Sequence, residues 1–264
     1  MTAAVITVAG VSSRFNQGME EDQKYLKAVY TEGSPKETLL FHLLENCRYM
    51  DHIIVVGGYQ YDRLKHYIEL VLPENLKSRI MLLKNDHYED FGSGYSLWLG
   101  LQAVFGLADI SEVIFAEGDL DMDESSFHAV ADSDRTVLTY NDEPIRADKA
   151  VVFYQNEAGQ YRYAFDCSHG FLRIRDAFSC IYNSGQLWKF TDMEILQTVS
   201  RQFGETDQRG TNLMLIQEYC NRISQNEIRL TRLYGWTNCN TREDYRRIVR
   251  RWRNENTAGE DAES

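Results

Sequence analysis

The chain has 264 residues, 43% of them hydrophobic, which is enough to build one large α/β domain with a core and is typical of a globular protein. Its formal net charge of −12 argues against nucleic acid or an anionic membrane as a partner, because both attract basic surfaces. The five cysteines lack CxxC spacing, which favours reduced thiols over a disulfide or zinc framework.

The first predicted element is an apolar strand that runs into a loop of small residues. Ala4 to Val8 is apolar on both faces, which is typical of a buried strand in a parallel sheet. Small residues after the strand let backbone N–H groups approach an anion, and Arg14 can form two hydrogen bonds to phosphate oxygens. Lys24 and Lys27 follow. We interpret this segment as a phosphate-binding region, although such loops are also common as simple turns; neither GxGxxG nor GxxxxGK[ST] is present.

Helical and strand patterns alternate from here to residue 140. Apolar residues at helical spacing predict helices over 38–47 and 61–72. Short apolar runs predict strands over 52–56, 80–83, 112–117 and 136–140. This order predicts an α/β fold with a doubly wound, Rossmann-like mixed sheet, mostly parallel and flanked by helices, in which ligands bind at the carboxyl ends of the strands.

A glycine-rich turn precedes a further predicted helix near residue 93. The exposed amides and the positive dipole end of such a helix suit a nucleobase carbonyl or a phosphate, so Ser93, Gly94 and Ser96 are candidate binding residues. The same serines can instead be ordinary helix N-caps, and the residues alone favour that simpler role.

Asp119 follows the strand predicted over 112–117. A carboxylate just beyond the end of a central strand can reach a magnesium ion that bridges substrate phosphates, because Mg²⁺ takes one or two carboxylates together with phosphate and water oxygens. Asp123, four residues later, is interpreted as the N-cap of a helix over 124–130.

Antiparallel strands dominate after residue 135. An antiparallel hairpin is predicted over 150–165, with 178–182 extending the same sheet and a stretch over 184–190 continuing it. Helices are predicted over 192–203, 212–223 and 245–252, with a last strand over 228–233. We expect a single domain over 1–255, made of halves 1–140 and 141–255, and an acidic flexible tail over 256–264.

These segments resemble nucleotidyltransferases of the glycosyltransferase-A-like fold over nearly the whole chain. That family opens with an apolar strand, AAG-x-G-x-R and later Pro-Lys, which here read VAGVSSR over 8–14 and Gln23-Lys24. Ser12 therefore replaces a family glycine, and Gln23 replaces the proline. The Gly58-Tyr59 pair after the strand over 52–56 resembles the Gly-Tyr at the corresponding strand end of the family. The YSLW block over 95–98 resembles the phosphocholine cytidylyltransferase branch. The resemblance implies a nucleotide-binding half over 1–140 with these contact residues: Ala9, Gly10, Val11, Ser12, Ser13, Tyr59, Ser93, Gly94 and Ser96.

The resemblance also implies catalytic and metal-binding residues. Arg14 would hold the leaving phosphates, and Lys24 would neutralise the α-phosphate and the acceptor. Asp119 matches the family's metal-binding aspartate, whereas Asn240 stands where the family has its second one. Because an amide oxygen carries no charge, a Mg²⁺ site with Asn240 would depend more on Asp119 and the phosphates.

The implied activity is transfer of a nucleotide, with CTP preferred, to a phosphate or phosphonate monoester, with release of pyrophosphate. We expect an acceptor such as phosphocholine or 2-aminoethylphosphonate in the half over 141–255, where Trp188 and Trp236 could contact its ammonium group. A sugar-1-phosphate nucleotidyltransferase and a non-catalytic nucleotide-binding relative are the alternatives. We expect a cytoplasmic protein, because the N-terminus lacks a basic signal-peptide region and no apolar run is long enough to span a bilayer.

Overall fold

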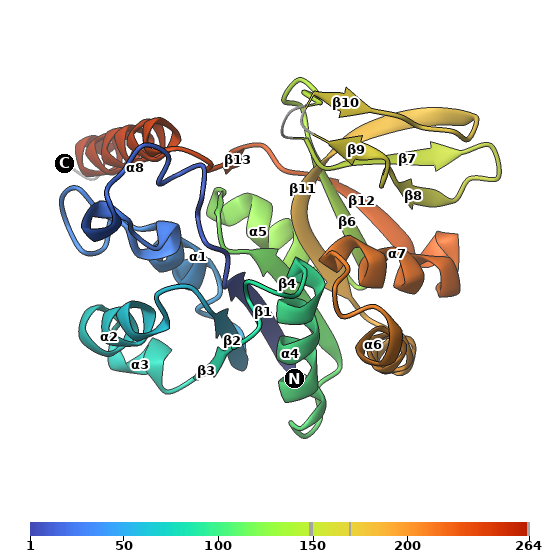
Figure 1. Cartoon of the computed structure of the whole chain (residues 1–264), viewed down its shortest axis with the longest axis horizontal. Coiled ribbons are helices and arrows are strands. Elements are labelled where there is room, and N and C mark those ends of the chain that lie inside the picture. The colour runs from blue at the N-terminus through green and yellow to red at the C-terminus, as the bar shows by residue number, and fades with distance from the viewer. Residues whose placement is uncertain (148–149, 169, 263–264) are drawn as a thin grey trace.

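The computed structural model describes residues 1–147, 150–168 and 170–262. A central sheet joins both halves of the chain in the order β12-β6-β11-β4-β1-β2-β3, with β7 also paired to β11 and β8 paired to β7 (Figure 1). Its strands are β1 (Thr2–Val8), β2 (His52–Gly57), β3 (Ile80–Lys84), β4 (Glu112–Glu117), β6 (Thr136–Asn141), β7 (Val152–Asn156), β8 (Tyr161–Tyr163), β11 (Phe178–Phe190) and β12 (Ile228–Arg232).

The directions of the strands confirm the predicted mixed sheet. β1, β2, β3 and β4 run parallel, as do β6 and β12. β11 runs antiparallel to β4, β6 and β7, and β7 forms a hairpin with β8. Because β1 and β4 are parallel neighbours, their carboxyl ends lie side by side, and the loops that follow them meet at one edge of the sheet.

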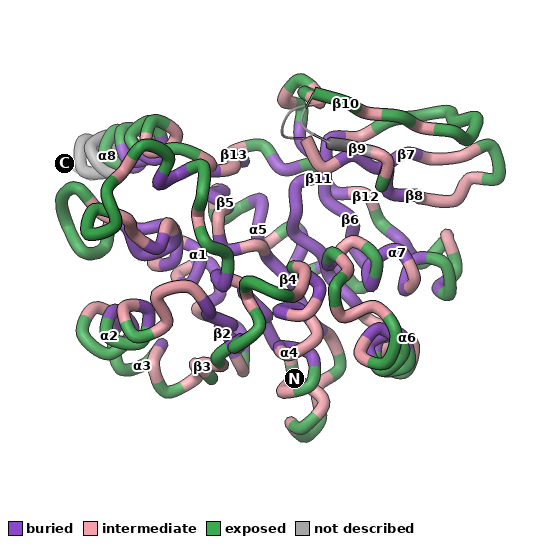
Figure 2. Tube along the Cα trace, viewed as in Figure 1, coloured by how far each residue is buried: buried purple, intermediate pink, exposed green. Residues whose placement is uncertain are grey.

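Helices cover both faces of this sheet, and the alternation of side chains along β1 shows how. Ala4, Ile6 and Val8 pack with the apolar residues of α1, α2 and α5, whereas Ala3 and Val5 pack with those of α4, α6 and α7. Figure 2 shows the buried strands between the partly exposed helices. The helices are α1 (Leu39–Asn46), α2 (Tyr61–Val71), α3 (Glu74–Lys77), α4 (Ser93–Phe105), α5 (Glu124–Ala131), α6 (Met193–Thr206), α7 (Asn212–Arg222) and α8 (Arg242–Ala262).

Several short elements complete the described chain. They are η1 (Glu21–Gln23), η2 (Lys27–Val29), η3 (Gln225–Glu227), β5 (Leu120–Asp121), β9 (Cys167–Ser168), β10 (Phe171–Leu172) and β13 (Thr237–Asn238).

Two further observations concern the helices. Asp123 caps α5 as expected, because its side chain accepts a hydrogen bond from Ser126 N. Among the described residues, no helix has the length and apolar character that crossing a membrane requires.

Two segments differ from the sequence-based expectations. The stretches over 178–182 and 184–190 form one strand, β11, whose register shifts between Ser184 and Trp188, where Gln186 has a φ of 55°. The expected flexible tail over 256–264 is instead helical through Ala262, and residues 263 and 264 lie outside the described part. A formed helix extends by one hydrogen bond per residue, and the sequence after residue 252 has no proline to end it.

Candidate functional site

A cavity of about 310 Å³ lies at the carboxyl ends of β1 and β4. The sheet brings its walls together from the loop after β1, the loop after β4, the start of η2 and the first turn of α4. This is the edge at which a ligand site is expected in a doubly wound sheet. The lining residues that matter below are Ala9, Gly10, Ser12, Lys27, Ser93, Ser96, Glu117, Gly118 and Asp119.

Gly118 allows the loop after β4 to pass close to β1. A Cβ atom at Gly118 would lie 2.2 Å from Val8 Cγ1 and 2.8 Å from Thr7 O, so a larger residue would clash. Instead, Gly118 N donates a hydrogen bond of 3.0 Å to Thr7 O. This close contact places the next residue, Asp119, at the cavity.

The cation that reaches Asp119 is Lys27. Lys27 Nζ lies 2.8 Å from Asp119 Oδ2, and both side chains are largely buried. Lys24, to which the family motif assigned the catalytic charge, is not part of the lining; its ammonium group pairs with Glu21 in a solvent-exposed loop. The correction follows from the turn at η2, which begins at Lys27 and directs that side chain into the cavity.

Other expected nucleotide-binding residues lie next to the cavity without lining it. Tyr59 N donates a hydrogen bond of 3.0 Å to Ala9 O and so supports the loop after β1 from behind. Gly94 is buried, and its N–H donates to Gly210 O at 3.1 Å, so this amide is already used. The expected residues outside the lining are Val11, Ser13, Arg14, Tyr59 and Gly94, with Val11, Ser13 and Arg14 exposed on the same loop.

Ser12 has the backbone conformation that a glycine adopts easily. Its φ of 56° lies in the left-handed region, which agrees with the glycine of the family motif at this position. The side chain offsets part of the strain, because Ser12 Oγ accepts a hydrogen bond from Lys27 N at 3.3 Å and donates one to Gly10 O at 3.4 Å. Ser12 thus ties the loop after β1 to the turn that carries Lys27.

The segment over 238–240 contacts Asp119. Cys239 N donates to Asp119 O at 2.8 Å, and Asn238 Nδ2 lies 3.5 Å from Asp119 Oδ1. In the described structure, the Oδ1 atoms of Asn238 and Asn240 are both buried without a hydrogen-bond partner. Buried oxygens of this kind are rare unless a ligand, an ion or water completes them.

These residues fit a magnesium ion. Mg²⁺ prefers oxygen ligands and takes few carboxylates when phosphates supply the others, so Asp119 with the amide oxygens of Asn238 and Asn240 is a suitable set. Among the described residues, no group of three or more His, Cys, Asp or Glu side chains could hold a metal ion, so a magnesium ion here would also need amide and substrate oxygens as ligands. The sequence does not single out Asn238, because an amide in a two-residue strand carries no distinctive signal.

Glu117 is a further cavity residue that the sequence analysis did not select. It ends β4 and accepts a hydrogen bond of 2.7 Å from Asn212 Nδ2, at the start of α7. Burial, together with the negative charge of Asp119, raises the pKa of Glu117 to about 7. The carboxyl group can therefore accept or donate a hydrogen bond near neutral pH. The sequence feature that could have identified Glu117 is a charged residue at the end of a buried strand.

The far end of the cavity is aromatic and amide-lined. Asn85 Nδ2 donates to Ser96 Oγ at 2.9 Å, and Asn85 Oδ1 accepts from His87 N at 2.8 Å. Tyr88 and Phe91 also line this end, and the Phe91 ring stacks on His87 with centroids 4.6 Å apart. Flat, polar and uncharged walls of this kind suit a nucleobase.

The tryptophans expected to bind the acceptor do not reach the cavity. Trp188 is fully buried, stacks on Phe115 with centroids 5.0 Å apart, and donates from Nε1 to Tyr163 Oη at 2.6 Å. Trp236 is buried as well, and its Nε1 donates to Gly185 O at 2.7 Å. Trp188 lies on β11 and Trp236 lies in the loop before β13; both rings are in the core, where protein atoms accept their N–H groups. The expected acceptor contacts at these positions are therefore corrected.

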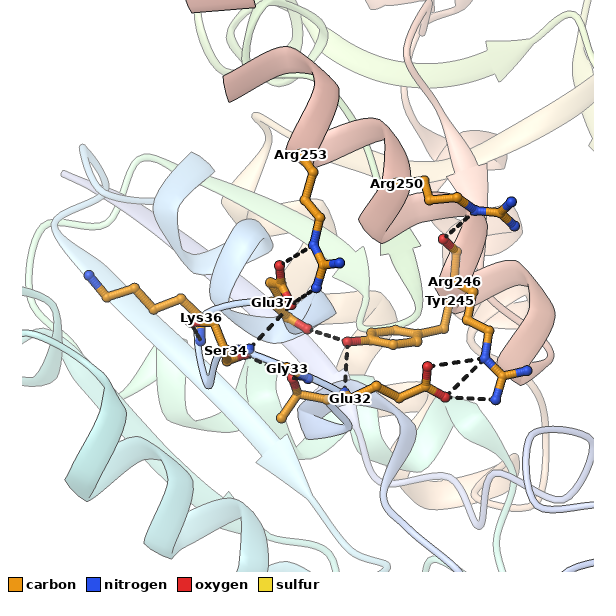
Figure 3. A network of polar contacts seen from close by, with 10 residues as sticks. Glu32, Gly33, Ser34, Lys36, Glu37, Tyr245, Arg246, Arg250 and Arg253 are labelled. Atoms are coloured by element: carbon orange, nitrogen blue, oxygen red, sulfur yellow. Dashed lines mark hydrogen bonds and ion pairs between the residues drawn. The ribbon is translucent and has the colours of Figure 1, made fainter. Parts of the chain in front are cut away.

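We call the segment over 14–37, which carries Lys27, the strap. Helix α8 contacts the strap at Glu32 and Glu37 (Figure 3). Arg246 forms hydrogen-bonded ion pairs with Glu32, with Nη2 2.8 Å from Oε1. Arg253 pairs with Glu37 in the same way, with Nε 2.6 Å from Oε1 and Nη2 2.7 Å from Oε2. Tyr245 Oη donates to Glu37 O at 2.9 Å. These contacts anchor the part of the strap that follows Lys27.

Nucleotidyltransferases of known structure share this fold. The inositol-1-phosphate CTP transferase from T. maritima is 12% identical, with a TM-score of 0.63 and 94% of each chain covered. The CTP:phosphocholine cytidylyltransferase from Streptococcus pneumoniae is 15% identical, with a TM-score of 0.61 and 94% of this chain and 98% of that chain covered. The nucleoside-diphosphate-sugar pyrophosphorylase from Vibrio cholerae RC9 is 17% identical, with a TM-score of 0.61 and 95% and 100% covered.

The fold expected from the family motifs is therefore confirmed. No curated protein matches this sequence. A family model matches residues 23–252, which include the strap from Gln23 onward, the loop after β4 and the first half of α8. The chain belongs to that family, described as Domain of unknown function (DUF6564).

Proposed function

We propose that this protein is a nucleotidyltransferase that joins a nucleoside triphosphate to a phosphate or phosphonate monoester and releases pyrophosphate. The observation that carries the proposal is the cavity itself. It combines a loop of small residues, a largely buried ammonium group and the Asp119 carboxylate, and the adjoining segment over 238–240 holds two buried amide oxygens without partners. The nucleotidyltransferase fold supports it, because the cavity lies at the sheet edge where ligands bind.

In this reaction an oxygen of the acceptor's phosphate attacks the α-phosphorus, and the bond to the β-phosphate bridging oxygen breaks. The acceptor is already an anion, so no general base is required, and the protein acts by positioning and by stabilising charge. Backbone N–H groups near Gly10 would face the phosphates, and Lys27 would neutralise the α-phosphate. Arg14, on the exposed side of the same loop, would reach the leaving β- and γ-phosphates.

Magnesium is part of the proposal. Asp119, Asn238 and Asn240 would hold the ion, which when bound would neutralise charge on the triphosphate and its leaving group. Asp119 is the only carboxylate in this ligand set. The triphosphate must therefore supply much of the remaining coordination.

We further propose CTP as the donor and a phosphorylated or phosphonylated amino alcohol, such as phosphocholine or 2-aminoethylphosphonate, as the acceptor. Two of the proteins with this fold are described as acting with CTP. The tryptophans no longer support a cationic acceptor, but Glu117 does, because it places a carboxyl group in the cavity that would attract an ammonium group or an amino donor. The net charge of −12 also favours a zwitterion over an additional anion.

Pyrophosphate release tests the proposal. The purified protein is assayed with CTP, UTP, GTP, ATP and dTTP, each with phosphocholine, 2-aminoethylphosphonate and a set of sugar-1-phosphates at equal concentration, with and without Mg²⁺. We expect release that requires both an acceptor and Mg²⁺ and is fastest with CTP and a zwitterion. A clear preference for sugars would establish the sugar-1-phosphate alternative. Nucleotide binding without release under any condition would establish the non-catalytic alternative.

A further inference from the structure

Lys27 forms an ion pair with Asp119, the carboxylate that a metal ion would need as a ligand. We propose that its ammonium group blocks Asp119 in the free protein and leaves it only when a triphosphate arrives, so that metal binding is coupled to nucleotide binding. This inference rests on the proposed function, and it assigns to Lys27 a second task, control of the metal site.

Each oxygen of the Asp119 carboxylate has a donor beside it. Lys27 Nζ lies 2.8 Å from Oδ2, and Asn238 Nδ2 lies 3.5 Å from Oδ1. The side chains of Lys27 and Asp119 are only 16% and 21% exposed, so solvent screens their attraction weakly. A metal ion that binds Asp119 would therefore lie close to the Lys27 ammonium group as long as the ion pair persists.

The charges near the metal site make entry of a divalent cation unfavourable before the nucleotide binds. The charge of Asp119 is offset by Lys27, and the remaining candidate ligands, Asn238 and Asn240, are neutral amides. The other carboxyl group in the cavity lining, that of Glu117, accepts a hydrogen bond from Asn212. An incoming cation would meet an ammonium group in a largely buried setting. We therefore expect weak binding of Mg²⁺ or Mn²⁺ to the free protein.

A triphosphate changes this balance in two ways. Its negative oxygens attract Lys27, whose long and flexible side chain lines the cavity and can turn from the carboxylate to a phosphate. The same phosphates supply oxygen ligands of the kind that Mg²⁺ takes alongside one or two carboxylates. The departure of Lys27 exposes Asp119 at the moment when those ligands become available. By thermodynamic linkage, the metal must strengthen nucleotide binding by the same factor.

Binding of Mn²⁺, measured by electron paramagnetic resonance without turnover, tests this coupling. The probes are Mn²⁺ alone and Mn²⁺ with α,β-methylene-CTP, corrected for the ion that the analogue binds by itself. The wild-type protein should bind Mn²⁺ roughly tenfold more tightly with the analogue, within the usual range of coupling between sites. Lys27→Met should bind Mn²⁺ several-fold more tightly than wild type when free, and the gain from the analogue should shrink.

Lys24→Met is the matched control, because Lys24 lies in the same segment but pairs with Glu21 outside the cavity. It should behave as wild type. Lys27→Gln, which is also uncharged, should repeat the result of Lys27→Met and replaces it if that variant does not fold. Equal Mn²⁺ affinity of free wild type and both Lys27 variants would overturn the inference. Absence of nucleotide binding by wild type would overturn the proposed function instead, and the free-protein comparison would still test Lys27.

Discussion

The polar groups of the α8–strap contact and those of the cavity are satisfied differently. Between α8 and the strap, Glu32 pairs with Arg246 and Glu37 with Arg253, each through more than one hydrogen bond (Figure 3). Next to Asp119 in the chain fold, Asn238 and Asn240 retain buried oxygens without a partner, and on α8 the Nε atom of Arg242 does so as well. Buried polar groups are normally bonded, so the carboxylates of Glu32 and Glu37 are satisfied within the protein, whereas the amide oxygens near the proposed metal site are atoms that a ligand would satisfy.

Aromatic packing also stabilises the α8–strap contact. The Tyr30 ring of the strap packs edge-on against Phe15 and Tyr245, with centroids 5.0 Å from each. Arg242 lies over Tyr30 at 4.8 Å and donates to Gln23 O at 2.8 Å. Changes in the α8–strap contact should therefore affect stability first, and changes in the cavity should affect turnover first. The four predictions below test this division.

The largest effect is expected from Asp119→Ala. Loss of the carboxylate removes the charged ligand of the proposed metal site, and loss of one such stabilising group typically costs a hundredfold or more in rate. Pyrophosphate release should therefore fall by about that factor, while the protein stays folded with a melting temperature lowered by the loss of the ion pair with Lys27. Turnover close to that of wild type would show that Asp119 is not the metal ligand and that the unpartnered oxygens do not mark the active site.

Asn240→Asp should have a smaller effect, in the opposite direction. A carboxylate in place of the unpartnered amide oxygen adds charge to the metal site, so the Mg²⁺ concentration needed for half-maximal rate should fall, or the rate should rise. Titration of pyrophosphate release with Mg²⁺ measures this change. Asn254→Asp, on α8, adds the same charge elsewhere and serves as the control. An identical Mg²⁺ dependence in both variants would contradict the prediction.

His42 connects α1 to α8 and should affect only the pH dependence of stability. Its ring stacks on Trp252 with centroids 3.6 Å apart, and burial lowers its pKa to about 4, below the usual value of about 6.5. The native protein thus keeps His42 neutral where the unfolded chain would protonate it. Its contribution is complete above pH 6.5 and is lost as the pH falls towards 4.

His42→Phe should therefore flatten the loss of stability between about pH 6.5 and 4, while keeping the stacked ring. Urea unfolding at several pH values measures the free energy of unfolding for both proteins. His66→Gln, at an exposed position of α2, serves as the control and should leave the profile as in wild type. A His42→Phe profile as steep as that of wild type would show that other groups produce the acid sensitivity.

The smallest effect is expected from Arg246→Ala. Its ion pair with Glu32 is exposed, with 55% and 37% of the two side chains accessible, and such pairs contribute little in water. The melting temperature should fall by about 2 °C or less. Arg250→Ala, which removes only a bond to the backbone of α8, should change it less. A large loss of turnover without a change in melting temperature would mean that the α8–strap contact belongs to the active site.

Local patterns in the sequence determined the elements of this fold. The apolar runs of β1 and β4, the spacing of α1 and the cap at Asp123 depend on neighbouring residues, so they are recognisable without the structure. The position of Asp119 was predictable for the same reason, since it directly follows a buried strand and the carboxyl ends of such strands meet at one edge of the sheet.

Only the tertiary structure decided which side chains share the cavity. Lys24 and Lys27 are equivalent by composition, and the turn at η2 separates them by direction. Trp188 appeared suitable for a ligand until the pairing of β11 placed it in the core. Asn238 meets Asp119 across 119 positions of the chain. Side-chain direction and contacts between distant segments depend on the packing of the whole chain, which no local pattern in the sequence contains.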